Sequence, residues 1–285
     1  MNKDFYNQSS ASNLGWDPTW FGEKYYDDKL VRAIKKWQKS NGLSADGLCG
    51  PTTFRRLWTE RQADIDDHKP EDCHYSNYIV YQGNFTPIEW DKVVSFVDFP
   101  SWKANHIGDR IGQPKRDIKL FVNHWDAALS SRDCHSILER RGLSCHLYID
   151  NDGTIINTCD LQNVTYHAGG RRWNETSIGV EISNAYYLRY QSKYESKGFG
   201  TRPIVRSQVH GKQLPPHLGF YPVQLEALKK LFDAVNGLGI PKQTPPVETI
   251  YEPAQNGEYS GFIHHFHLSK NKIDCSGALN ISDLF

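Results

Sequence analysis

The chain has 285 residues, of which 38% are hydrophobic and 23% are charged, enough for one sizeable core and a smaller domain. Its 33 lysines and arginines balance 33 aspartates and glutamates, so the formal net charge is zero. Nucleic acids and anionic membranes bind basic surfaces, so this balance argues against either as the main partner. The first ten residues hold no apolar segment typical of a signal peptide, and no stretch is long enough to span a bilayer.

The six cysteines form no Cys-x-x-Cys pair, which argues against a structural zinc site of four cysteines. We expect them to be reduced, buried thiols. In chain order, residues 1–25 show no clear period and are expected to wrap around the first domain.

A helical pattern begins near Lys29. Apolar residues recur there at helical spacing, at Val31, Ile34 and Trp37. Asn41-Gly42 ends this predicted helix, and Pro51 begins a second one that runs to Trp58 after a glycine-containing loop. The pattern predicts a small all-α domain over residues 1–62.

Two adjoining segments of this domain carry a resemblance: Ala33-Ile-Lys-Lys-Trp-Gln38 and Asn41-Gly-Leu-Ser-Ala-Asp-Gly-Leu-Cys-Gly-Pro-Thr-Thr53. Together they resemble the peptidoglycan-binding domain 1 family, over about thirty residues. A generic helical hairpin would not need Asp46-Gly47 and Gly50-Pro51 at these offsets. The resemblance implies that the module binds cell-wall peptide or glycan.

Residues 63–80 are mostly polar and are predicted to be a linker, followed by a second domain over residues 81–285. Apolar spacing predicts a helix within Pro87–Asp98, and residues 99–117 are expected to be loop. Further along, strands alternate with helices, which predicts an α/β domain with a mixed central sheet flanked by helices. The elements are a strand at 117–125, a helix at 131–142, a hairpin at 144–156, a loop at 166–170, a strand at 177–182 and a helix at 221–238. An irregular insertion, 186–218, interrupts them.

Two apolar runs end in histidine, which is the main chemical signal of the second domain. His124 ends Leu120-Phe-Val-Asn-His, and His265 follows Gly261-Phe-Ile. Asp274 and Cys275 follow soon after, and a catalytic zinc needs three protein ligands and an open position. The residues therefore predict a Zn²⁺ site formed by His124, His265 and Asp274.

Two further residues suit hydrolysis at such a metal. Glu181 lies inside the apolar strand 177–182, where a carboxylate is costly unless it is paired or lines a cleft, so we expect a general base. Lys272 is expected to stabilise an oxyanion, although an ordinary solvated lysine is an equal alternative.

Five pieces of the second domain resemble the type 2 N-acetylmuramoyl-L-alanine amidases, the superfamily that includes the peptidoglycan recognition proteins. In order they are Val122-Asn-His124, Leu143-Ser-Cys-His-Leu-Tyr-Ile-Asp-Asn-Asp-Gly-Thr154, Tyr166-His-Ala-Gly169, Ser177-Ile-Gly-Val-Glu-Ile182 and His265…Lys272-Ile-Asp274. The resemblance implies zinc ligation by His124, His265 and Asp274 and catalysis by Glu181 and Lys272. His167 matches a position that lines the substrate cleft, and His146 matches a histidine that is usually not a ligand.

Three departures from the family pattern leave alternatives open. His264 stands where the family has glycine, so His264 is an alternative ligand to His265. Cys275 replaces a proline and is an alternative to Asp274. Cys145 stands where some members have tyrosine, which leaves Glu181 as the main candidate base.

These features predict a cell-wall hydrolase that resembles a phage endolysin and uses zinc to cut between N-acetylmuramic acid and L-alanine. Trp125 and Asn184 are expected to contact substrate together with His167. We expect a monomer that is made in the host cytoplasm without a signal peptide, does not insert into a membrane and acts on the wall. The alternatives are a non-catalytic peptidoglycan receptor and a zinc peptidase that cuts the stem peptide.

Overall fold

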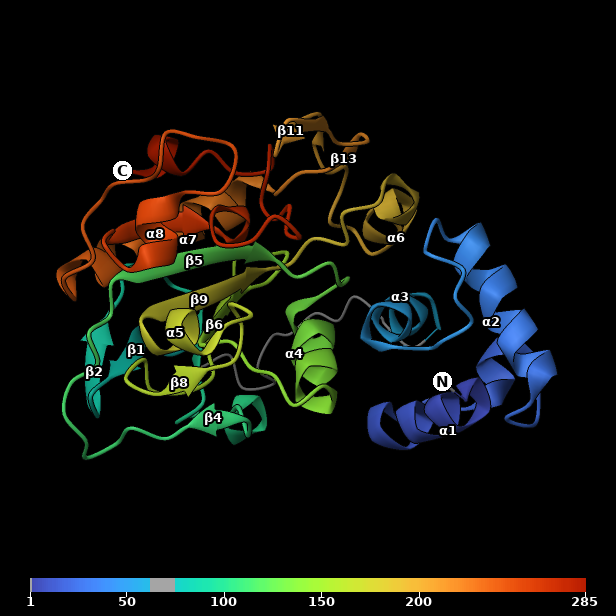
Figure 1. The fold of residues 1–285 in the computed structure, drawn as a ribbon. Coiled ribbons are helices and arrows are strands. Elements are labelled where there is room, and N and C mark those ends of the chain that lie inside the picture. Colours follow the sequence, from blue (N-terminus) through green and yellow to red (C-terminus); the bar gives the residue numbers. More distant parts are fainter. Residues whose placement is uncertain (1, 62–74) are drawn as a thin grey trace. The chain divides into compact units, whose positions relative to one another are not determined.

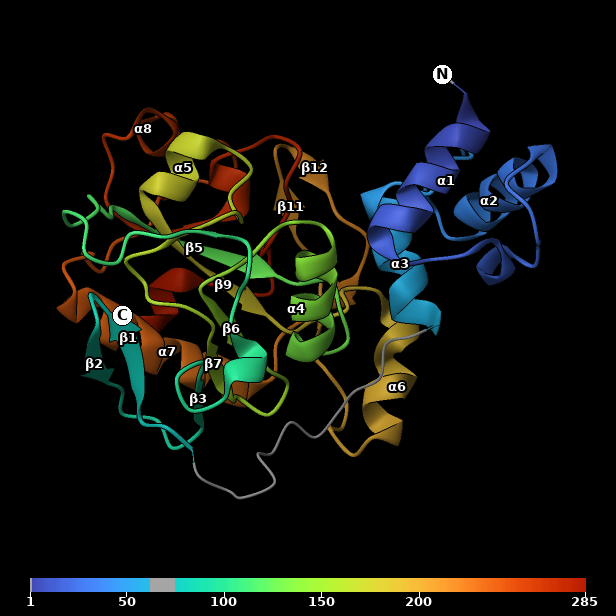
Figure 2. The same cartoon turned by 90° about the horizontal axis from the view of Figure 1, so that it is seen from below.

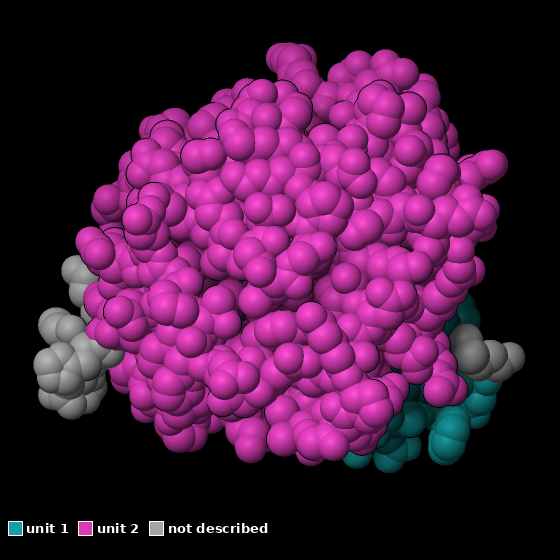
Figure 3. Space-filling view, turned by 90° about the vertical axis from the view of Figure 1, so that its left-hand side faces the viewer, with its two compact units in different colours: residues 1–64, 136–142 teal, residues 65–135, 143–285 magenta. Residues whose placement is uncertain are grey.

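The computed structural model describes residues 2–61 and 75–285. The chain divides into two compact units, residues 1–64 with 136–142 and residues 65–135 with 143–285 (Figure 3). Most of the predicted linker, 63–80, lies outside the described residues. Strand β1 (Tyr78–Tyr81) already pairs with β2 (Asn84–Pro87), three residues before the predicted domain start, and the domain boundaries stay predictions.

The first unit is helical (Figure 1), with α1 (Lys3–Leu14), η1 (Pro18–Phe21), α2 (Asp28–Ser40) and α3 (Pro51–Arg61). The two predicted helices are present, and residues 1–25, which show no apolar period, also contain a helix, α1, that was not predicted. The side chain of Asn2 caps α1, and Gly15 ends it in a left-handed conformation. Asn7 and Ser10 are buried on α1, so its inner face is partly polar and gives no apolar period.

Polar contacts fix the loop between α2 and α3. The amide nitrogen of Gln38 donates to Asp46 Oδ1 at 2.8 Å and to Thr53 Oγ1 at 3.0 Å, and its Oε1 accepts from the backbone of Gly47 at 2.9 Å. Gly47 has φ of 78°, and a Cβ there would lie 2.8 Å from Val31. The residues that carry the first resemblance therefore shape this loop from within.

The second unit is built on a six-stranded mixed sheet, which confirms the predicted fold class. The strand order is β14-β5-β9-β6-β7-β3, and all neighbours are parallel except β6 and β7. The strands are β3 (Val93–Ser95), β5 (Leu120–Trp125), β6 (Leu147–Ile149), β7 (Ile155–Asn157), β9 (Ser177–Ile182) and β14 (Gly261–His264).

Helices and short ribbons surround this sheet. The helices of this unit are α5 (Arg171–Glu175), α6 (Gln191–Ser196), α7 (Pro222–Gly237) and α8 (Glu252–Asn256). Helix α4 (Ser131–Arg140) begins in this unit, and its residues from 136 onward are grouped with the first unit. The 3-10 turns are η2 (Pro100–Trp102), η3 (Leu188–Tyr190), η4 (His265–His267) and η5 (Ile281–Leu284). Two-stranded ribbons pair β4 (Ile107–Gly108) with β8 (Val164–Thr165), β10 (Ile204–Val205) with β13 (His217–Leu218), and β11 (Gln208–Val209) with β12 (Lys212–Gln213).

The predicted strands, the hairpin and the later helices of this unit are confirmed, but the helix within Pro87–Asp98 is wrong. Val93 and Val94 lie in β3, which pairs in parallel with β7. A short apolar run is compatible with the period of a helix and with that of a strand. Here pairing with a distant strand makes the segment a strand. Among the described residues, no helix is long and apolar enough to cross a bilayer.

The two faces of the sheet differ. Phe121, Ile178 and Val180 point into the main core, where they meet Leu231 and Phe232 of α7. Because side chains alternate along a strand, Ser177, Gly179 and Glu181 of β9 share the other face with His124 of β5. Figure 2 shows α5 and α8 on one side of the sheet and α7 on the other. The polar residues therefore gather on the face opposite α7.

Candidate active site

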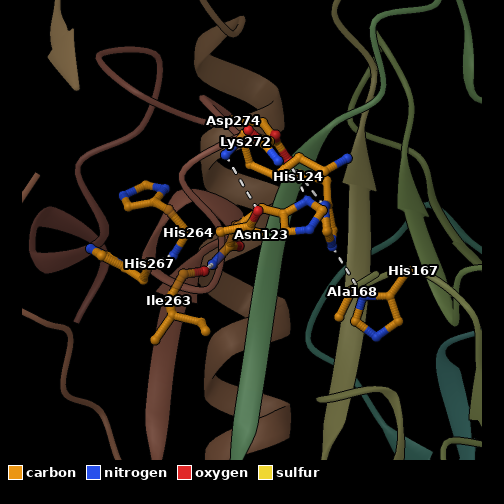
Figure 4. Close-up of polar contacts among 12 residues, drawn as sticks. Asn123, His124, His167, Ala168, Ile263, His264, His267, Lys272 and Asp274 are labelled. Atoms are coloured by element: carbon orange, nitrogen blue, oxygen red, sulfur yellow. Dashed lines mark hydrogen bonds and ion pairs between the residues drawn. The ribbon is translucent and has the colours of Figure 1, made fainter. Parts of the chain in front are cut away.

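Three predicted ligands meet at the carboxyl ends of parallel strands β5 and β14. Figure 4 shows two of them, His124 and Asp274, facing each other. The Nδ1 atoms of His124 and His265 lie 3.0 and 3.1 Å from Oδ2 of Asp274. All three residues are buried, and their candidate ligand atoms lie within 4.8 Å of one another. Ligands at about 2.0–2.1 Å from a tetrahedral zinc are separated by roughly 3.3 Å, so this spacing suits Zn²⁺.

His124 is oriented from behind by a chain of hydrogen bonds. Its Nε2 lies 3.0 Å from Nδ1 of His167, whose Nε2 lies 3.1 Å from Oγ of Ser177. That hydroxyl donates its one proton to the carbonyl oxygen of Trp173 at 2.5 Å. Ser177 therefore accepts from His167 Nε2–H, and His167 Nδ1 accepts from His124 Nε2–H.

This chain of donors leaves a lone pair on His124 Nδ1, and that lone pair faces a carboxylate. Burial, and next His265, lower the pKa of His124 to about 4, so the ring is neutral at pH 7. Burial raises the pKa of Asp274, but the neighbouring His265 outweighs it and holds this pKa well below its usual range. A neutral imidazole and an ionised carboxylate are the forms that bind metal.

His265 brings a second ring nitrogen to the same carboxylate oxygen. Its Nδ1 lies 3.1 Å from Oδ2 of Asp274, nearly as close as the Nδ1 of His124. The Nδ1 atom of His124 carries no proton, so it cannot donate a hydrogen bond to the ionised Asp274. A cation between this nitrogen and the carboxylate oxygen would interact favourably with both atoms. The residues present therefore fit a bound Zn²⁺.

A glycine makes room for the orienting histidine. A Cβ on Gly179 would lie 2.4 Å from Nδ1 of His167 and 2.6 Å from its Cγ. The imidazole of His167 therefore rests directly on strand β9, two residues from Glu181. A side chain at position 179 would displace the ring.

The two predicted catalytic residues lie near this cluster. Glu181 is 9% exposed and is the register partner of His124 on the adjacent parallel strand, so both side chains leave the same face. Lys272 is exposed on the loop that carries Asp274, and its charge contributes to lowering the pKa of His124 (Figure 4).

The structure separates the alternatives for the ligands. His264 is the register partner of Asn123, so its side chain leaves the face opposite His124, and it stacks on Phe266 at 4.8 Å between ring centroids. His265 lies after the strand, where η4 turns the chain toward Asp274. Cys275 packs into the main core, and burial raises the pKa of its thiol well above the usual value, so the metal-binding thiolate is disfavoured.

Trp125 and Asn184, expected to contact substrate, are not brought to the cluster. Trp125 is 7% exposed in the main core, on the face opposite His124, because strand side chains alternate. The Asn184 side chain is fully buried, donates to Leu218 O at 2.7 Å and accepts from Tyr186 N at 2.8 Å. Its amide therefore has a structural role.

His146 is likewise structural, in line with its exclusion as a ligand. Its Nδ1 accepts from the backbone N–H of Gly179 at 3.1 Å, and its Nε2 donates to the carbonyl of Asn163 at 2.9 Å. Burial, and next Arg116, lower its pKa to about 3. The five cysteines in the described part of the chain are buried, as expected.

Sequence reasoning missed Ser177 and Gly179 as parts of this site. Their signal was the two-residue period Ser177, Gly179 and Glu181, in which small and polar residues alternate with apolar ones. This period indicates that one face of the strand is not apolar, while the opposite face packs in the core. The period does not predict that the imidazole of His167 lies on the first of these faces.

Two family models match the chain. Residues 12–57 match the peptidoglycan binding domain, and residues 114–274 match N-acetylmuramoyl-L-alanine amidase. No curated protein matches the chain.

Several solved structures are similar at low identity. A selenomethionine derivative of AmpD is 16% identical with a TM-score of 0.35, and the match covers 66% of this chain and 89% of that one. AMPDH3 from Pseudomonas aeruginosa, in complex with anhydromuramic pentapeptide, is 18% identical with a TM-score of 0.39, and the match covers 60% of each chain. The endolysin amidase LysCS from Clostridium intestinale URNW is 15% identical with a TM-score of 0.35, over 65% of this chain and 86% of that one.

The amidase model spans more than half of the chain and includes every residue of the His124, His265 and Asp274 cluster. This match confirms the predicted resemblance of the second domain to the amidases. The match to residues 12–57 confirms the predicted resemblance of the first domain to the peptidoglycan-binding family. The chain belongs to the N-acetylmuramoyl-L-alanine amidase family and carries a peptidoglycan-binding domain ahead of its amidase domain.

Proposed function

We propose that the chain is a zinc-dependent enzyme that hydrolyses the amide bond between the lactyl group of N-acetylmuramic acid and L-alanine in peptidoglycan. His124, His265 and Asp274 would hold Zn²⁺ through two Nδ1 atoms and one carboxylate oxygen. The observation that carries this assignment is the convergence of three buried side chains whose ligand atoms lie within 4.8 Å of one another. When bound, Zn²⁺ polarises a carbonyl and lowers the pKa of a water molecule.

The chain's own residues would supply the proton transfer and the positioning. Glu181 would take the proton from the attacking water, because it lies beside His124 on the adjacent strand. Lys272 would stabilise negative charge that develops on the carbonyl oxygen. His167 would keep the Nε2 proton of His124 directed away from the ligand atoms.

The test uses purified peptidoglycan and the full chain. We expect a chelator to abolish the release of wall fragments and added Zn²⁺ to restore it, and mass spectrometry to show cleavage at the lactyl–alanine bond. Cleavage within the stem peptide would instead identify a zinc peptidase. Wall binding without any chelator-sensitive release would identify a receptor.

Zinc content distinguishes the ligands. Asp274→Ala should lose the ion, whereas Cys275→Ala should keep it, because the thiol packs in the core. The opposite result would make Cys275 the third ligand.

We also propose that the protein is a monomeric, endolysin-like wall-lytic enzyme whose first unit concentrates the amidase on its substrate. The match of residues 12–57 to a peptidoglycan-binding family supports this role. A chain without residues 1–62 should sediment less with purified wall and keep its turnover of a soluble muropeptide. Equal sedimentation of both chains would contradict the role.

A further inference from the structure

The insertion 186–218 lies between β9 and α7 and ends beside the loop that carries two site residues. Its hairpin β11–β12 lies next to the red C-terminal part of the chain in Figures 1 and 2. The loop, 269–277, contains Lys272 and Asp274 and no helix or strand. Its internal hydrogen bonds are turns, such as Lys272 N to Ser269 O at 3.0 Å and Ser276 N to Ile273 O at 2.9 Å.

Side chains of the insertion hold this loop on both sides of Asp274. Before it, His210 Nε2 donates to the carbonyl oxygen of Lys272 at 2.9 Å. After it, the carbonyl oxygen of Ser276 lies 3.2 Å from Ser207 Oγ and 3.1 Å from His217 Nε2. The two segments approach so closely that a Cβ on Gly277 would lie 2.5 Å from Cβ of Ser207.

The insertion is itself anchored to the sheet. Arg202 is 1% exposed and donates to the carbonyl oxygens of Ser183, which follows β9, and Gly219, which precedes α7, each at 3.0 Å. Its guanidinium lies 4.2 Å from the ring centroids of both Tyr194 and Tyr221. A buried cation held between two rings and two carbonyls gives the insertion a rigid base.

We propose that residues 186–218 brace the loop 269–277, with His210 and Ser207 as positioning residues for Asp274 and Lys272. An irregular loop samples many conformations, and fixing it in advance spares the entropy of ordering it when the ion or substrate binds. The brace acts through backbone carbonyls on either side of Asp274, so it sets where the carboxylate points. The inference rests on the proposed zinc site for its effect on catalysis.

The experiment compares His210→Ala with His210→Gln in the full chain. Gln retains an N–H donor that can reach Lys272 O, whereas Ala has none. Gln213→Ala is the matched control, because Gln213 lies on the same hairpin and its side chain donates to Ser207 O within the insertion and not to the loop 269–277. Three readouts are hydrogen exchange of a peptide spanning 269–277 in excess chelator, Zn²⁺ affinity by competition with a chromophoric chelator, and kcat and KM.

We expect His210→Ala to speed exchange of this peptide and to weaken zinc affinity or kcat by a few fold, because His210 contacts the backbone beside Asp274 and not the ligand itself. His210→Gln should recover most of the loss, and Gln213→Ala should match the wild type. A thermal midpoint within ~2 °C of the wild type would exclude general unfolding. Ser207→Ala serves as a second variant from the other side of the loop.

Asp274→Ala separates this inference from the proposed function. If Asp274→Ala loses zinc while His210→Ala and Ser207→Ala change neither exchange nor zinc affinity, the brace is wrong and the zinc site stands. If Asp274→Ala keeps zinc, the proposed site is wrong, and the exchange measurement, which needs no metal, still decides whether the insertion holds the loop.

Discussion

Both compact units contain a buried polar cluster built from their family motif, and the clusters differ in how fully their atoms are hydrogen-bonded. In the first unit, the Gln38 amide donates to Asp46, Leu48 and Thr53 and accepts from Gly47. In the second unit, Nδ1 of His124 and Nδ1 of His265 both face the same carboxylate oxygen of Asp274. The first cluster is complete within the chain, whereas the second fits one more ligand.

This difference in hydrogen bonding shows that the residues of a motif can have a fixed spacing for two different reasons. A complete network stabilises a loop, and its residues act on function only by shaping a surface. An incomplete network of buried imidazole and carboxylate is costly unless an ion completes it. Each prediction below changes one cluster and leaves the other as an internal reference.

Acid should produce the largest difference between the units. The folded pKa values of His124 and His146 are about 4 and about 3, against about 6.5 in the unfolded chain. The unfolded state therefore binds protons that the folded state does not, and stability is lost as pH falls below about 6.5. Each histidine should cost the second unit roughly 2 kcal/mol at pH 5 relative to pH 7.

Pulse proteolysis in urea with excess chelator, with fragments assigned by mass, would measure this loss. Residues 2–61 contain no histidine, so the first unit should change much less. Equal losses in both units would contradict neutral burial of these two rings.

Gln38→Leu should have the next largest effect, confined to the first unit. The change leaves Asp46, the Gly47 N–H and Thr53 without their buried partner, which should cost about 2–3 kcal/mol of folding free energy. Hydrogen exchange of the α2–α3 loop would report the loss. The exposed Ser40→Ala on the same helix is the control, and turnover of a soluble muropeptide should not change.

His167→Ala should weaken Zn²⁺ affinity by about 10- to 100-fold, because His124 loses the acceptor that fixes its Nε2 proton. Chelator competition would measure this change. Since His167 is also predicted to contact substrate, KM alone would not distinguish the roles. An unchanged zinc affinity with a raised KM would assign His167 to substrate binding only.

Ser177→Ala should have the smallest effect, a loss of zinc affinity of a few fold, because His167 then lacks its outer acceptor while its contact with His124 remains. The double variant with His167→Ala should be no weaker than His167→Ala itself. Additive losses would show that Ser177 acts by another route.

The sequence by itself determined the α/β class, the central strands and long helices of the second unit, the membership of both families and the three residues that meet at the site. It could do so because strand-end histidines and the Lys-x-Asp tail are local patterns with a fixed chemistry. It missed helix α1, whose buried face is partly polar, and misassigned β3, whose pairing is with a strand far along the chain.

Only the tertiary structure decided among neighbouring candidates. The sequence does not distinguish His264 from His265 as the ligand. In the structure, β14 ends so that His264 points to the core face of the sheet, whereas His265 points toward Asp274. Trp125 follows His124 in sequence but leaves the opposite face of the same strand. The contacts of His167 with Gly179 and of His210 with Lys272 join segments whose proximity no local pattern encodes, because packing alone brings them together.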